Sequence, residues 1–147
     1  MAPRPELPAD ADGTQPDEAG TEPMPPPDQP YIATVTLRAV ASTEVDAFEL
    51  VIIYPRSAGD FVGNRNGVDC RKTGDATMFA DDHEDGMLRV LVASPRALTF
   101  PFDIVCRFTV APNATLTSRL IAVNVAEVTF GNQPADASAL TVSVSAR

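Results

Sequence analysis

The stretch from Phe102 to Val110 constrains the fold more than any other part of the chain. Apolar residues occupy every second position in it, with mostly polar residues between them. Alternation over nine residues places one set of side chains in a core and the other toward water, which is typical of a half-buried β-strand. The inward set includes Cys106, and the chain has one other cysteine, Cys70. The stretch therefore predicts both an antiparallel sheet and a candidate cross-link.

Similar alternation recurs along the rest of the chain. Longer segments of this kind occur at 31–40, 48–54, 87–94, 119–128 and 140–145, and shorter ones at 68–70 and 76–80. No segment combines helical periodicity with a cap and sufficient length. Eight or nine short strands separated by turn residues predict an all-β fold, a single antiparallel β-sandwich. Apolar residues point to both sides of segment 48–54, so we expect a central strand that is covered on both faces.

The first 30 residues differ in composition from the rest. They hold nine of the 14 prolines and seven of the 20 acidic residues, and few large apolar side chains. Such a segment cannot bury enough surface to offset the entropy of ordering it. We therefore expect a disordered, acidic, Pro-rich linker over residues 1–30 and one folded domain over residues 31–147. The linker resembles a stalk between a folded module and an anchor.

Charge and hydropathy argue against two classes of partner. The formal net charge is −9 and Lys72 is the only lysine, so we expect no nucleic acid binding, which needs clustered basic residues. No apolar run approaches the roughly 20 residues that span a bilayer, so we expect no transmembrane segment. The N-terminus also lacks the apolar stretch of a secretion signal. Either the protein is cytosolic, or its export signal lies outside the given sequence.

The two cysteines allow two interpretations. As free thiols, Cys70 and Cys106 would act as small buried apolar side chains. As a disulfide, they would close a loop of about 37 residues and stabilise the fold by roughly 3–4 kcal/mol in the chain-entropy model. Such a bond persists only in an oxidising compartment. We favour the disulfide, and with it an extracellular, cell-surface or periplasmic location.

Several strand patterns follow one another in an order found in a known family. These segments are Val35–Val40, Phe48–Pro55, Gly59–Gly67, Gly86–Ala93, Ile104–Val110 and Arg119–Val128. In this order they resemble the cohesin-like domains and the bacterial cellulose-binding modules that share their jelly-roll sandwich. The resemblance implies a jelly roll with a recognition surface. The chain departs from usual members in its cysteine pair, in the adjacency of Tyr54 and Pro55, and in the absence of a following dockerin-type calcium-loop segment.

A Gly- and Asn-rich loop supplies the candidate ligand-binding residues. Asn64, Arg65 and Asn66 lie in this loop, and Tyr54 precedes it. Sugar sites commonly stack exposed aromatic rings on the sugar, and this chain has no tryptophan. The aromatic residues expected near a surface or loop are Tyr31, Tyr54, Phe61 and Phe100. A flat cellulose-binding strip is therefore not expected, whereas a polar, groove-type glycan site stays open.

An acidic turn provides the candidate metal ligands. Asp81, Asp82 and Asp85 could offer carboxylate oxygens to calcium, but the turn lacks the residue order of an EF-hand. A solvated hairpin turn is the preferred interpretation, with His83 as an exposed turn residue. The sequence marks neither a nucleophile beside a base nor a two-carboxylate centre. We therefore expect no enzymatic activity and no cofactor.

Three functions are compatible with these features. The first is a non-catalytic, exported, cohesin-like binding module that recognises a protein or polysaccharide at the cell surface, and we expect it to be monomeric. The second is a carbohydrate-binding module with a weak groove-type glycan site. The third is a structural surface domain without a specific ligand.

Overall fold

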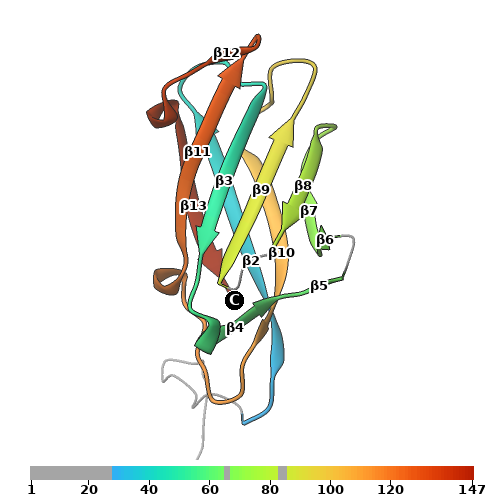
Figure 1. Cartoon of the computed structure of the whole chain (residues 1–147), viewed down its shortest axis with the longest axis vertical. Helices are drawn as coiled ribbons and strands as arrows, with labels where there is room; N and C mark the ends of the chain where they lie inside the picture. Colours follow the sequence, from blue (N-terminus) through green and yellow to red (C-terminus); the bar gives the residue numbers. More distant parts are fainter. Residues whose placement is uncertain (1–27, 65–66, 83–85) are drawn as a thin grey trace, which may run out of the picture.

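This computed structural model describes residues 28–64, 67–82 and 86–147, which form two five-stranded antiparallel sheets and a two-stranded hairpin (Figure 1). The strands of the first sheet are β2 (Tyr31–Ala41), β4 (Gly59–Phe61), β7 (Cys70–Lys72), β10 (Phe102–Val110) and β13 (Leu140–Ala146). Their order is β13-β2-β10-β4, and β7 pairs with β10 beside β4. The pairing of β10 with β2 aligns Phe102 with Ala39 and Val110 with Tyr31, so β10 is paired with β2 along its whole length.

The second sheet has the order β12-β11-β3-β9-β8. Its strands are β3 (Ala47–Ile53), β8 (Thr77–Asp81), β9 (Met87–Ala93), β11 (Ala122–Phe130) and β12 (Gln133–Pro134). The remaining elements are the hairpin of β5 (Gly63–Asn64) with β6 (Gly67–Val68), and the 3-10 turns η2 (Arg56–Ala58), η3 (Ser118–Leu120) and η4 (Ala137–Ala139). The expectation of an all-β, antiparallel fold is therefore confirmed.

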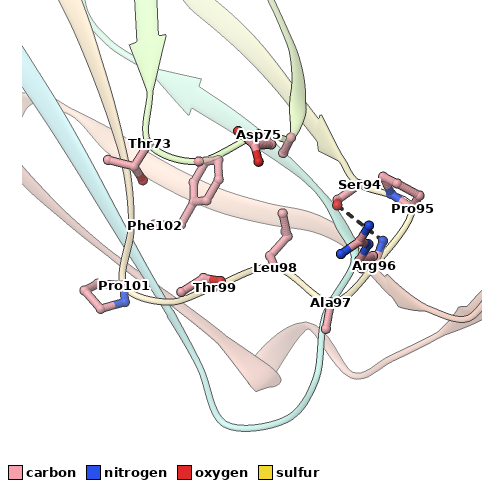
Figure 2. Close-up of a pocket in the computed structure, with 12 residues that line it drawn as sticks. Thr73, Asp75, Ser94, Pro95, Arg96, Ala97, Leu98, Thr99, Pro101 and Phe102 are labelled. Atoms are coloured by element: carbon pink, nitrogen blue, oxygen red, sulfur yellow. Dashed lines mark hydrogen bonds between the residues drawn. The ribbon is translucent and has the colours of Figure 1, made fainter.

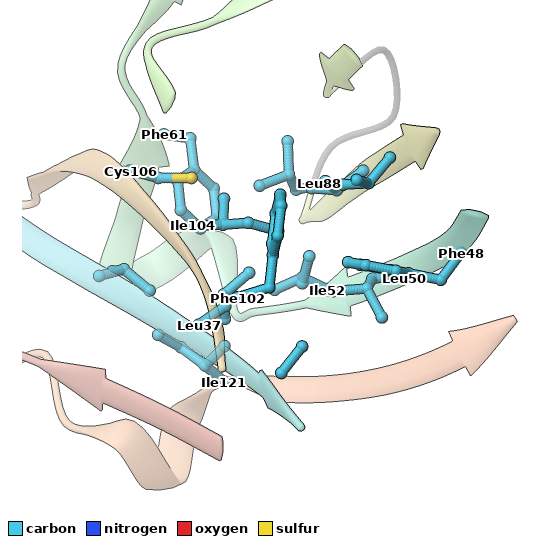
Figure 3. Packing of buried hydrophobic residues seen from close by; sticks show 14 of the residues in the cluster. Leu37, Phe48, Leu50, Ile52, Phe61, Leu88, Phe102, Ile104, Cys106 and Ile121 are labelled. Atoms are coloured by element: carbon cyan, nitrogen blue, oxygen red, sulfur yellow. The ribbon is translucent and has the colours of Figure 1, made fainter. Parts of the chain in front are cut away.

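The core lies between the two sheets, which face each other as in a sandwich. The inward side chains of β10 are at most 2% exposed, and this strand has the bounds that its alternation predicts. Opposite them, Phe48, Leu50 and Ile52 of β3 point into the same space (Figure 3). Alternation thus sets which side of each strand is buried, because successive side chains point to opposite faces.

The edge of β10 is covered by two separate short strands. Phe61 pairs with Phe108, while Cys70 pairs with Cys106, two residues earlier on β10. Between Val62 and Asp69 the chain makes an excursion away from β10. At its base, the Val62 N–H donates to the Arg107 carbonyl, the Arg107 N–H donates to the Asp69 carbonyl, and the Asp69 N–H donates to the Val62 carbonyl. The hairpin β5·β6 lies within the excursion, and β6 contacts β8 at the edge of the second sheet.

Two details of the sequence-based expectation were wrong. The structure has more strands than the eight or nine expected, because β5, β6 and β12 have two residues each and are too short to show alternation. Strand β3 is central, but its second side is not covered by the described part of the chain, where Ile53 is 44% exposed.

Two further expectations concern the ends of the chain and membranes. Within the described ranges, no helix has the length and apolar character needed to cross a bilayer. Most of the expected linker, residues 1–27, lies outside the described residues. The first described residues, 28–30, are exposed and lead directly into β2.

Candidate functional site

The two cysteines form a disulfide, as predicted. Cys70 and Cys106 stand directly opposite each other on β7 and β10, with 4.1 Å between their Cα atoms. Cys106 is fully buried and Cys70 is half-buried. Because Cys70 directly follows Asp69, where the excursion returns to β10, the bond fixes this return point of the chain.

Tyr54, a candidate ligand residue, lies in the core. Its side chain is 4% exposed, and its ring meets Phe61 and Phe108 edge-on at centroid distances of 5.1 and 5.4 Å. Its hydroxyl donates a hydrogen bond to Asp60 Oδ1. Phe61, also expected near a surface or loop, ends β4 and is 5% exposed. In this position, the Tyr54 ring packs the core instead of presenting a face to a ligand.

The other predicted site residues are only partly described. Asn64 forms the end of β5 and pairs with Gly67, while Arg65 and Asn66 lie outside the described residues. Asp81 ends β8 opposite Arg89, whereas His83 and Asp85 lie outside the described residues. Within the described ranges, no three His, Cys, Asp or Glu side chains gather in a way that could hold a metal ion.

Tyr54 is expected to stay un-ionised in the folded domain at pH values where a free phenol titrates. Its pKa is raised, first by burial and then by its hydrogen bond to Asp60 and that carboxylate's charge. Because the folded-state pKa exceeds the unfolded value of about 10, this contribution to stability is complete below pH 10 and is lost as the pH rises through the folded pKa. In a Tyr31→Phe variant, which retains Tyr54 as its single tyrosine, phenolate absorbance should rise only with unfolding. Phenolate absorbance at pH 10 in a fully folded sample would contradict this assignment.

The outer side of the second sheet exposes large apolar side chains on three neighbouring strands. Phe79 on β8 is 67% exposed and pairs directly with Leu91 on β9, which is 42% exposed. Ile53 on β3 pairs with Met87 on β9, and half-buried Val51 lies on the same side of β3. We call this surface, formed by these five residues, the β8–β9–β3 face. Sequence reasoning missed Phe79, although its alternation with Met78 and Ala80 places it on the same side as the polar Thr77 and Asp81.

The outer side of the first sheet is different in character. Its middle carries hydroxyl and charged groups, including Thr36 of β2 and the bidentate pair of Arg38 with Asp103 (2.8 and 3.0 Å). Its exposed large apolar residues, Ile32 and Val40, lie eight positions apart on β2, or about 26 Å at the usual rise per residue. The two outer surfaces therefore differ: only the β8–β9–β3 face groups its exposed apolar residues.

A pocket of about 540 Å³ opens between two connecting loops (Figure 2). One wall is the turn between β7 and β8, with Thr73 and Asp75, and the other is the loop between β9 and β10, with Arg96 and Leu98. Phe102 lies at the inner end. We call this space between the two loops the loop pocket. The sequence identifies both segments as loops but carries no signal of the space between them.

Comparison with known proteins adds no assignment. No protein-family model matches this chain, and no curated protein matches it.

Proposed function

We propose that this chain is a non-catalytic, exported, cohesin-like binding module that holds a protein partner against the β8–β9–β3 face. The observation that carries the proposal is the exposure of Phe79. Its side chain is 67% exposed and lies beside Leu91, which points to the same side of the sheet. Grouped exposed apolar side chains with polar surroundings mark interaction surfaces, whereas single exposed apolar residues need no explanation. Burying both side chains against a partner would remove this apolar surface from water.

The chain path supports a jelly roll of the cohesin-like kind. From β2 to β3, from β3 to β4 and from β7 to β8, each connection passes from one sheet to the other. The connections from β9 to β10, from β10 to β11 and from β12 to β13 do the same. Repeated crossing between two antiparallel sheets is the connectivity expected of a double-sheet jelly roll.

The disulfide supports export. A bond between Cys70 and Cys106 persists in secreted, periplasmic or cell-surface proteins, whereas cytosolic thiols are kept reduced. The described residues contain no free cysteine. An oxidising environment is also where a surface-displayed binding module would meet its partner.

The chemistry of the face favours a protein over a polysaccharide. Four of its five residues are aliphatic or thioether side chains, which bury well against another protein, and Phe79 supplies the single ring on the face that could stack on a sugar. Around them, the outward carboxylates of Glu49 and Glu127 outnumber Arg89, which forms an ion pair with Glu49 at 3.2 Å. The partner that fits is a folded protein with an apolar patch and a basic rim.

Replacing Phe79 by alanine should weaken partner binding by about 30-fold, the effect of losing an interfacial aromatic worth about 2 kcal/mol. The matched control is Ile32→Ala, which removes an exposed apolar side chain from the opposite sheet. The partner is first isolated from exported proteins of the source cells with the wild-type domain as bait, and then titrated by calorimetry against both variants. Equal affinities of the two variants would contradict the proposal.

A second measurement separates protein binding from polysaccharide binding. Affinity gel electrophoresis with soluble polysaccharides should leave the migration of the domain unchanged. Retardation that persists in Phe79→Ala would instead assign the chain to the carbohydrate-binding modules and contradict a protein-binding face.

A further inference from the structure

The loop pocket has fixed walls. The Thr73 N–H donates to the Asp103 carbonyl at 3.1 Å, and the Asp103 N–H donates to Thr73 Oγ1 at the same distance. On the other wall, the Leu98 N–H donates to the Val45 carbonyl at 2.7 Å. Both loops are therefore tied to the sheets, so a ligand would not have to order them first.

The inner part of the pocket is apolar. Ala76 and Phe102 are buried at 6% and 2% exposure, and the half-buried Leu98 side chain points into the space between the walls (Figure 2). A volume of about 540 Å³ lies within the range of small-molecule sites, which combine an apolar lining with a few polar groups that set orientation.

Two opposite charges stand at the mouth, one on each wall. Asp75 belongs to the β7–β8 turn and Arg96 to the β9–β10 loop. Among the described residues, neither side chain has an ion-pair or hydrogen-bond partner; only the Arg96 backbone N–H is engaged, with Ser94 Oγ. The mouth thus offers one carboxylate acceptor and one guanidinium fork across an apolar interior.

We propose that the loop pocket binds a short apolar peptide with free ends. Asp75 would accept hydrogen bonds from the ammonium group, and Arg96 would hold the terminal carboxylate, the bidentate partner for which guanidinium is suited. The apolar side chains would lie against Leu98, Ala76 and Phe102. A neutral sugar fits less well, because the Phe102 ring is too buried to stack on it and both charges would remain unpaired.

The probe is leucyl-leucine, titrated into the isotopically labelled full chain and followed by NMR. Amide shifts should concentrate in residues 73–76 and 94–102, with a Kd no weaker than millimolar. Acetylating the peptide amine, or amidating its carboxylate, should each weaken binding about tenfold, as expected for losing a charge-assisted hydrogen bond. No shift up to 10 mM, or equal binding of the doubly blocked peptide, would overturn the proposal.

Variants assign each end of the peptide. Asp75→Asn should bind about tenfold more weakly and lose most of its sensitivity to acetylation, and Arg96→Gln should likewise lose its sensitivity to amidation. Arg119→Gln, an exposed arginine outside the pocket, is the matched control and should bind as the wild type does. Because both pocket residues are exposed, the variants should fold normally; full sensitivity to blocking in both would contradict the assigned roles.

Discussion

Removing the Cys70–Cys106 disulfide should lower the free energy of unfolding by about 3–4 kcal/mol and Tm by about 10–20 °C. The bond joins residues 36 positions apart, so it removes much loop-closure entropy from the unfolded chain. It also holds the three-residue strand β7 to β10. Urea unfolding of oxidised protein and of the Cys70→Ala/Cys106→Ala variant measures the difference.

The loss should be local as well as global. Hydrogen exchange of amides in β7 and residues 67–69 should accelerate more than exchange in β3, which lies in the other sheet. Reduced wild-type protein serves as the matched control, because it keeps both cysteine side chains in the core. Equal unfolding midpoints for oxidised and reduced protein would show that the bond contributes nothing to the fold.

Replacing Phe108 by alanine should cost about 3–5 kcal/mol of stability. The side chain is fully buried, and its ring meets Tyr54 and Phe61 edge-on at 5.4 and 5.0 Å. Truncation removes its transfer free energy and leaves a cavity between two rings whose own positions are fixed by the sheets. Denaturant unfolding measures the loss, with an unchanged slope indicating unchanged compactness.

The matched control for Phe108→Ala is Phe79→Ala. Both remove a phenylalanine ring from a strand, but Phe79 is 67% exposed, so its loss should change stability by at most about 0.5 kcal/mol. Similar losses in the two variants would mean that Phe79 packs against the protein itself. A small loss with weakened partner binding would separate its role from that of Phe108.

Strands with long alternation could be predicted from the sequence, and those without it could not. Residues 102–110 alternate throughout, and β10 has these bounds. Strands β5, β6 and β12 have two residues each, which is too short for alternation. Their pairing is set by the neighbouring segments of the fold and not by their own sequence pattern. The same alternation placed Cys106 inward, but only the fold brings Cys70 opposite to it.

The candidate site was harder to predict, because it depends on what lies outside the sheet. Val51 and Ile53 form a second apolar side on β3, a pattern that is the same whether another layer of the chain or another molecule covers it. The structure leaves that side open within the described residues. Tyr54 was expected near a ligand because it precedes a loop. Its place in the core follows from the alternation of β3, which puts Tyr54 on the same side as Leu50 and Ile52.

The most direct test of the proposed function is photo-crosslinking from the two outer surfaces. A photoreactive phenylalanine replaces Leu91 on the β8–β9–β3 face in one variant and Thr36 on the outer side of the first sheet in the other. We expect one exported protein to crosslink from position 91 and not from position 36. Adding Phe79→Ser should abolish this crosslink, and the purified pair should form a stoichiometric complex. Equal crosslinking from both positions, or a crosslink that survives Phe79→Ser, would contradict the binding of a partner at the β8–β9–β3 face.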